Sequence, residues 1–282
     1  AWWLLGKGPK EDLASLVVDH LNRISKTLLY AVAQNNNHGT SEAAGLFIGG
    51  AWLVRHGESE KQRKFGSHCV KTGRRWLEDR VSTLIFDDGG FSQYSVNYHR
   101  VLLDTLSQVE FWRLELAQPV FSACFYVKAR AAIKWLLSII NIDSGHVINL
   151  GANDGSRLYS LSESSYDDFR PSLQLFSVLI DGEKLFFDSM CDEPLVWLGL
   201  NDVPPISEIK LTSVVLRDSG IVAMRSDNFL AVVKLADRKF RPSHADCLHL
   251  DLFHRNKNLL RDAGSYSYHD QEWHDYFSGT SS

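Results

Sequence analysis

The feature that most constrains the fold is a change of hydrophobic pattern at 201–205, where the chain reads Asn-Asp-Val-Pro-Pro. Before this stretch, apolar residues recur at steps of three and four, which is typical of the buried face of a helix. After it, short apolar runs alternate with turn residues, which is typical of antiparallel hairpins. We therefore predict an α+β fold, with a helical domain at 1–203 and an antiparallel β-sheet domain at 204–282.

The same periodicity locates the individual elements. Helices are predicted at 9–32, 43–55, 61–86, 95–117, 125–140 and 171–180. The second is expected to open with Ser41 as its N-cap, and the third to be interrupted at Gly66 or Gly73 because glycine weakens a helix interior. Strands are predicted at 214–216, 221–224, 229–235 and 248–252, the last followed by a turn at 255–258.

Composition excludes several classes of protein. Hydrophobic residues make up 44% of the 282 residues and charged residues 23%, which is typical of a globular rather than a disordered chain. The formal net charge of -4 gives no basic field of the kind that binds nucleic acid. No apolar run reaches the ~18 residues of a membrane span, and no signal peptide is visible. The four cysteines are scattered, so neither a zinc ribbon nor a disulfide framework is indicated.

A polar cluster at 35–38, Asn-Asn-Asn-His, separates the first two predicted helices. Backbone N–H groups and the helix dipole make such a position favourable for an anion. Asn37 offers an amide donor, His38 can carry a positive charge near neutral pH, and Glu42 follows at the helix start. Two interpretations stay open here: a helix–helix loop whose asparagines are caps, or a site for a carboxylate.

A second candidate is Tyr98, which lies in the first turns of a predicted helix beside His99 and Arg100. An unperturbed tyrosine, with a pKa of about 10, is a poor base at neutral pH, and neighbouring cations would lower that value. The alternative is a tyrosine packed on a helix face with its hydroxyl hydrogen-bonded.

A third candidate is the pair His244 and Asp262, at the entry of one strand-like run and the exit of the next. A hairpin brings such ends together, so the pair is expected either to share a metal or to form a His–Asp hydrogen bond. Two ligands are too few for zinc, which takes three or four from the protein.

Taken together, four motifs in this order resemble the heparinase II/III family of polysaccharide lyases. They are NNHGTSEAAGL, DGGFSQYSVNYHR, NLGANDGSRL with DDFRPSLQ, and SHADCLHLDLFHRNKNLLRDAGSYSY, and they extend from about Ala33 to Tyr276. The resemblance implies an incomplete (α/α) toroid followed by an antiparallel β-sheet domain. It implies that this sequence corresponds to the later toroid helices and the start of the sheet domain.

The resemblance also implies a chemistry, which is the cleavage of a uronic-acid polysaccharide by β-elimination. The residues matching the family's carboxylate-neutralising pair are Asn37 and His38, and Tyr98 matches its catalytic tyrosine, a general acid whose further role as base is left open. Glu42 matches a position near the site and is expected to orient other groups. Some members carry a further histidine as base where this sequence has Pro242, so Tyr98 is expected either to make both proton transfers or to be assisted by His99.

The resemblance implies further contacts and partners. Asn153 and Asp154 are expected to face the cleft and, with Glu42 and His99, to bind substrate. His244 and Asp262 are expected to be two ligands of a structural zinc whose third ligand lies beyond Ser282. The expected partner is an acidic polysaccharide, with no nucleic acid and no membrane span. A periplasmic or extracellular bacterial location is expected, although this sequence shows no signal peptide.

Two alternatives remain from the residues alone. A glycoside hydrolase on a helical toroid needs two carboxylates flanking the scissile bond, and no motif pairs the four candidates Glu42, Asp87, Asp88 and Asp154. A glycan-binding or assembly protein of the same fold needs no catalytic group.

Overall fold

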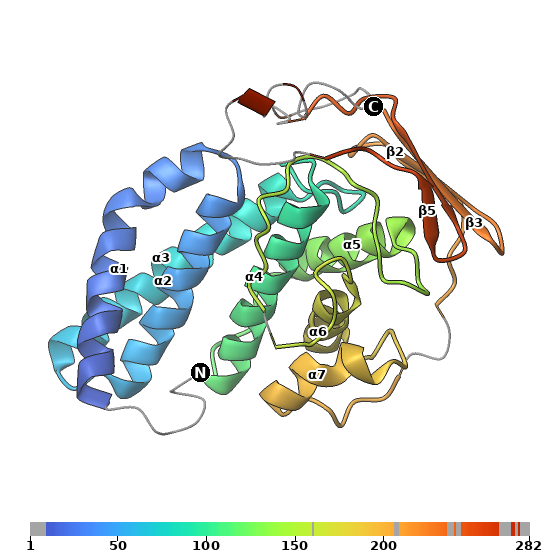
Figure 1. Ribbon diagram of the computed structural model, residues 1–282. Helices are drawn as coiled ribbons and strands as arrows, with labels where there is room; N and C mark the ends of the chain where they lie inside the picture. The colour runs from blue at the N-terminus through green and yellow to red at the C-terminus, as the bar shows by residue number, and fades with distance from the viewer. Residues whose placement is uncertain are drawn as a thin grey trace. The chain divides into compact units, whose positions relative to one another are not determined.

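The computed structural model describes residues 10–159, 161–205, 209–235, 240, 244–264, 272–273 and 276. Helices α1 to α7 precede a five-stranded sheet, so the α+β prediction is confirmed (Figure 1). The helices are α1 (Lys10–Ala33), α2 (Asn37–His56), α3 (Glu60–Leu84), α4 (Val96–Glu115), α5 (Ala123–Ile139), α6 (Arg170–Asp181) and α7 (Ser189–Leu198). The strands are β1 (Val214–Leu216), β2 (Ile221–Arg225), β3 (Phe229–Lys234), β4 (Leu250–His254) and β5 (Lys257–Leu260).

The chain forms two compact units. The first comprises Ala1–Val81 and Gln108–Ser122, and the second comprises Ser82–Ser107 and Ala123–Ser282. Helices α5, α6 and α7 therefore belong to the same compact unit as the sheet, although helices give way to strands between α7 and β1. The predicted domain boundary between residues 203 and 204 marks where helices give way to strands. As a boundary between domains it stays a prediction. None of the helices in the described ranges is both long and apolar enough to cross a bilayer.

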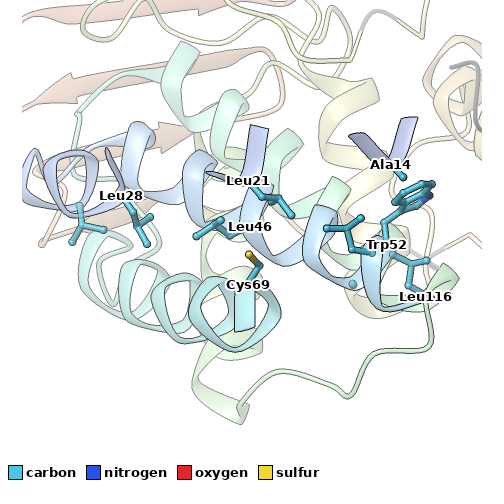
Figure 2. Packing of buried hydrophobic residues seen from close by; sticks show 10 residues of the cluster. Ala14, Leu21, Leu28, Leu46, Trp52, Cys69 and Leu116 are labelled. Atoms are coloured by element: carbon cyan, nitrogen blue, oxygen red, sulfur yellow. The ribbon is translucent and has the colours of Figure 1, made fainter. Parts of the chain in front are cut away.

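The first unit is held together by an apolar cluster in which α1 packs along α2 (Figure 2). Leu21 and Leu28 of α1, Leu46 and Leu53 of α2, and Cys69 of α3 are all at most 4% exposed. The α1 and α2 pairs are each seven residues apart, which places their side chains on one face of the helix. The periodicity that predicted these helices is thus the periodicity of their buried contacts.

Helix α3 runs without a break, so the predicted interruption at Gly66 or Gly73 is wrong. Both glycines lie where α3 crosses α2. A Cβ on Gly66 would lie 2.7 Å from the carbonyl oxygen of Gly50, and one on Gly73 would lie 2.5 Å from the backbone nitrogen of Phe47. Glycine is present here because the two backbones approach too closely for any side chain, and packing outweighs its poor helix propensity.

Helix α2 begins at Asn37, six residues before the predicted start at position 43, and its N-cap is Asn36 rather than Ser41. The Asn36 Oδ1 accepts a hydrogen bond from the His38 backbone N–H at 3.0 Å. Asn35, with a φ of 52°, makes the left-handed turn out of α1, a conformation that asparagine tolerates better than most residues. Asn36 is therefore the cap of α2, and Asn37 and His38 lie in the first helical turn, where a carboxylate site stays a prediction.

The second unit contains an antiparallel sheet in the order β1-β2-β3-β4-β5. The predicted hairpins are confirmed, with Leu216 opposite Ile221 and Phe229 opposite His254. β4 begins at Leu250 rather than at position 248, because Leu248 has a φ of 64° and belongs to a turn. Helix α7 was missed because it is only ten residues long and carries Pro194 in its interior, a residue normally excluded from helices.

Three polar contacts tie the helices of this unit to its sheet. The Trp135 indole Nε1 of α5 donates to the Ser219 hydroxyl at 2.8 Å, in the turn between β1 and β2. The Asp88 carboxylate accepts from the Ser219 backbone N–H at 2.8 Å and from its hydroxyl at 2.9 Å. One serine thus joins α5, the turn after α3 and the first hairpin of the sheet.

Candidate active site

Tyr98 lies in the first turn of α4, and the adjoining loop is fastened to that turn. Ser95 caps the helix, since its Oγ accepts from the Tyr98 backbone N–H at 3.2 Å, and the same hydroxyl donates to the Ala152 carbonyl at 2.6 Å. The Val96 backbone N–H donates to the Leu150 carbonyl at 3.1 Å. The start of α4 therefore fixes the loop 149–155, which carries two of the predicted site residues.

This arrangement brings Tyr98 and Asp154 together, although 56 residues separate them in the sequence. The half-buried Tyr98 donates its hydroxyl to Asp154 Oδ2 at 3.0 Å. Asn97 Nδ2 donates to the other carboxylate oxygen, Asp154 Oδ1, at 2.9 Å, and so does the backbone N–H of Ser156. Partial burial tends to raise the pKa of Asp154, but the hydrogen bonds from Ser156 and Tyr98 outweigh it and hold that pKa below its usual value. Asp154 is therefore ionised at neutral pH.

A second layer supports this pair. The Tyr166 hydroxyl lies 2.7 Å from the Oδ1 atoms of both Asn97 and Asn153. The buried Arg100 guanidinium donates to Asn97 Oδ1 at 3.2 Å and lies 4.2 Å from the centre of the Tyr166 ring. A buried cation on an aromatic face is a rigid support. Neither Asn97 nor Tyr166 was predicted as a site residue, although Asn97 is adjacent to the predicted catalytic tyrosine and Tyr166 directly precedes the motif DDFRPSLQ.

His99 is a core residue, so its predicted role in substrate binding or proton transfer is wrong. Its side chain is 0% exposed, it stacks on Trp135 with ring centres 4.5 Å apart, and its Nε2 lies 3.0 Å from the Ala132 carbonyl oxygen. Burial lowers the pKa of His99 to about 4, so it is neutral at neutral pH and is not a cation beside Tyr98. Successive residues of a helix are rotated by about 100° around its axis. The side chain of Tyr98 can therefore be half-exposed while that of the next residue, His99, points into the core.

The other predicted residues, Asn37, His38 and Glu42, belong to the first compact unit. Asn37 is half-buried and His38 is exposed, both at the amino end of α2. Glu42 Oε2 accepts from the Thr27 hydroxyl at 3.2 Å, which ties this part of α2 to α1. The turn between the two helices is held by Arg80, which donates to the Asn35 side chain at 2.9 Å and to the Val32 carbonyl at 3.1 Å. The structure thus presents an amide and an imidazole at the positive end of a helix.

His244 and Asp262 meet as the predicted hairpin requires, with Nε2 3.0 Å from Oδ1 and both side chains at most 1% exposed. Lys234 lies among them: its Nζ is 3.0 Å from Asp246 Oδ2 and 3.8 Å from Asp262 Oδ2. Partial burial tends to raise the pKa of Asp262, but the hydrogen bonds from His244 and the Gly264 N–H, together with Lys234, hold it below its usual value.

These contacts bear on the predicted zinc. A buried ammonium already supplies positive charge to the carboxylates, and no group of three or more His, Cys, Asp or Glu side chains within the described ranges is arranged to hold a metal. Among the described residues His244 and Asp262 form a hydrogen-bonded pair, and a zinc whose third ligand lies beyond Ser282 stays a prediction. Pro242, where some relatives carry a further histidine, lies outside the described residues.

A cavity of about 210 Å³ lies beside the Tyr98 network, because Asn153 and Tyr166 belong to both. The aromatic residues Phe169 and Phe253 provide apolar lining, and the exposed Arg261 provides a positive charge. The Asp167 carboxylate also lines the cavity, so its lining combines amides, aromatic rings and charges of both signs, which suits a polar ring.

Comparisons with known proteins place these features in a family context. Residues 209–282 match the family model Heparinase II/III-like, C-terminal. The fold is similar to that of the Heparinase III-BT4657 gene product, with a TM-score of 0.60 and 16% identity over 90% of this chain and 38% of that one. It is also similar to heparinase III (TM-score 0.64, 11% identity, 96% of this chain and 46% of that one). A third similar structure is heparan sulfate lyase HepC from Pedobacter heparinus (TM-score 0.59, 16% identity, 94% of this chain and 39% of that one).

At these identities the structural likeness concerns the fold, and the chain spans less than half the length of each of these three proteins. No curated protein matches the sequence. The family model covers the last of the four motifs, and the similar folds agree with the order of helices and sheet that the resemblance implies.

Proposed function

The chain is heparinase II/III-like in its fold and in residues 209–282, and we propose that it is part of a lyase that cleaves a uronic-acid polysaccharide by β-elimination. In this reaction the proton on C5, next to the uronate carboxylate, must be removed while the bond from C4 to the leaving oxygen breaks. The enzyme must neutralise the carboxylate, accept the C5 proton and protonate the leaving oxygen.

The observation that carries the proposal is the hydrogen bond between Tyr98 and Asp154 at the start of α4. It holds a phenol hydroxyl in one position on a side chain that is only half-buried, on a loop and helix end that are themselves fastened by Ser95. A proton-transfer group must be held within hydrogen-bond reach of the reacting atoms. In the proposed reaction, Tyr98 transfers protons to and from the sugar.

Carboxylate neutralisation is assigned to Asn37 and His38. The amide of Asn37 donates hydrogen bonds, His38 contributes positive charge when protonated, and both occupy the positive end of α2. Removing charge from the carboxylate makes the C5 proton more acidic, and that is the electrostatic part of the catalysis. Glu42, held by Thr27, keeps this helix end in place against α1.

The same chemistry favours an acidic polysaccharide as the substrate. The cavity lined by Asn153, Arg261 and Asp167 adjoins the Tyr98 network. We assign it to a sugar adjoining the cleaved bond. Such polymers lie outside the cytoplasm, so the proposed location is the periplasm or the cell exterior of a bacterium.

A glycoside hydrolase on this fold is less well supported. It requires two carboxylates placed on either side of the scissile bond. Asp88 is used to hold Ser219, and Asp87 is paired with Lys128 at 2.6 Å. Asp154 holds Tyr98, and Glu42 accepts from Thr27 in the other compact unit. Each candidate carboxylate thus has a separate structural partner.

The test is an ultraviolet-monitored screen of the full-length protein on heparan-type chains, alginate and bacterial surface polymers. A lyase leaves a C4–C5 double bond that absorbs ultraviolet light, and a hydrolase does not. We expect absorbance to rise with at least one uronate polymer. Cleavage without this absorbance would support the hydrolase, and binding without cleavage would support a glycan-binding protein of the same fold.

A further inference from the structure

The proposed reaction needs a proton acceptor, and the histidines considered for it are not in position. His99 is enclosed in the core, and the motif position at which some relatives carry a histidine is Pro242 here. The group that does meet the Tyr98 hydroxyl is a carboxylate, that of Asp154. We propose that Asp154 accepts the hydroxyl proton of Tyr98 and so allows a neutral tyrosine to act as the base. This inference rests on the proposed lyase function.

The geometry of Asp154 is suited to this role. Its Oδ2 faces the Tyr98 hydroxyl at 3.0 Å, while Oδ1 is occupied by the Asn97 side chain and the Ser156 backbone N–H, each at 2.9 Å. Donors on Oδ1 fix the rotation of the carboxylate and leave Oδ2 directed at the phenol. A group that served only to bind substrate would not need both oxygens engaged by its own protein.

The loop that carries Asp154 is anchored at several points. Ser95 holds Ala152, and the backbone N–H of Gly151 donates to Asp246 Oδ2 at 2.9 Å. Gly151 has a φ of 68°, and a Cβ at this position would lie 2.1 Å from the Tyr94 carbonyl oxygen, so only glycine permits the approach to α4. The contact between Tyr98 and Asp154 is therefore a consequence of the fold at this helix end.

Charged side chains act on the Tyr166 ring, which supports the Tyr98–Asp154 pair through Asn97 and Asn153. Arg100 from α4 lies on the Tyr166 ring, and Asp167, next to Tyr166, also acts electrostatically on that ring. Hydrogen bonds keep the pKa of Asp154 below its usual value, so it is ionised and ready to accept a proton at neutral pH. Because the pKa of Asp154 is low, transfer of the Tyr98 hydroxyl proton to Asp154 is unfavourable as a separate step. This transfer must therefore occur together with the removal of the C5 proton by the Tyr98 oxygen.

The proton balance closes within the two residues. As the C5–H bond breaks, its proton passes to the Tyr98 oxygen, and the original hydroxyl proton of Tyr98 passes to Asp154 Oδ2. The electron pair left at C5 forms the C4–C5 double bond and the C4–O4 bond breaks. Tyr98 then gives its proton to O4 and recovers one from Asp154. The cycle ends with a neutral tyrosine and an ionised aspartate, without any free phenolate or further reactant.

The experiment compares Asp154→Asn, Asp154→Glu and Tyr98→Phe with the unaltered full-length protein, by initial rates of unsaturated product between about pH 5 and pH 10. Asp154→Asn should lose about 10²–10⁴-fold in kcat at neutral pH, the usual contribution of a proton-transfer group, with little change in KM. Its rate should then rise about tenfold per pH unit toward the ordinary tyrosine pKa of about 10, because only a phenolate can now act as base. Asp154→Glu should recover part of the loss. Asp143→Asn, which removes another exposed carboxylate of the same unit, should match the unaltered protein.

Three outcomes would overturn the role of Asp154 alone. They are a full rate for Asp154→Asn, a higher KM with unchanged kcat, and a lower rate with an unaltered pH profile. In each of these cases the unaltered protein still forms unsaturated product and Tyr98→Phe does not. If the unaltered protein forms no unsaturated product from any uronate polymer, the proposed lyase function fails and the role of Asp154 fails with it. Thermal melts of all variants separate loss of folding from loss of proton transfer.

Discussion

Replacing Lys234 by methionine tests whether the buried charge cluster in the sheet is organised as described. The Lys234 side chain is 1% exposed, and its ammonium lies 3.0 Å from Asp246 Oδ2 and 3.8 Å from Asp262 Oδ2. Both carboxylates are also at most 1% exposed. Methionine preserves most of the volume and removes the charge, so two carboxylates remain buried without it.

The size of the effect follows from this burial. Removing one partner of a buried ion pair costs about 3–5 kcal/mol, because the other charge stays out of water. That is a large part of the 5–15 kcal/mol that stabilises a typical domain. The exposed pair of Lys64 with Glu60, at 2.7 Å and about three-quarters exposed on both sides, provides the control. Lys64→Met should change stability by less than about 1 kcal/mol.

Urea unfolding at two pH values gives the measurement. The folded-state pKa of Asp262 is lowered, so its stabilising contribution is present at neutral pH and is lost as the pH falls through that value. Lys234→Met should therefore show its largest deficit at pH 7 and a smaller one below about pH 4, where carboxylates become protonated. Equal urea midpoints for Lys234→Met and the unaltered protein at pH 7 would refute the arrangement.

The remaining predictions concern helix packing, capping and a buried histidine. Gly73→Ala should destabilise by at least about 1–3 kcal/mol in urea unfolding, because its Cβ would lie 2.5 Å from the Phe47 nitrogen; Gly45→Ala, whose Cβ meets only the end of a flexible side chain at 3.0 Å, should be far milder. Asn36→Ala should cost about 1 kcal/mol by the same assay, since it removes the cap of α2. Because burial lowers the pKa of His99 to about 4, the unfolded state takes up its proton first as the pH falls, so stability should decrease by up to about 3 kcal/mol between pH 6.5 and pH 4; His99→Gln should flatten this decrease.

Much of the fold could be predicted because the periodic patterns in the sequence are the buried faces themselves. Leu21 and Leu28 predict α1 by their spacing, and they are the residues that pack on α2. One error occurs where a tertiary contact outweighs a local preference. Gly66 and Gly73 are poor helix formers in isolation, yet they allow α3 to cross α2 closely. The residues next to either glycine in the sequence do not indicate that the backbone of α2 packs against it.

The candidate site could be predicted only in part, for a similar reason. The motifs identified Tyr98 and Asp154, which the structure places in contact. They also suggested His99, which is adjacent to Tyr98 in sequence but turns into the core. Conversely, Tyr166 supports the network through Asn97, which is 69 residues away, and its position just before the motif DDFRPSLQ does not indicate this contact. Adjacency in sequence says little about which side of a helix a side chain occupies.

The most direct test of the central claim is the formation of unsaturated product by the full-length protein and by its Tyr98→Phe variant on the same uronate polymer. Phenylalanine keeps the ring and removes only the hydroxyl that Asp154 holds. The account predicts ultraviolet-absorbing product from the unaltered protein and a loss of about 10²-fold or more in the variant. Equal rates for the two proteins, or cleavage that leaves no C4–C5 double bond, would contradict it.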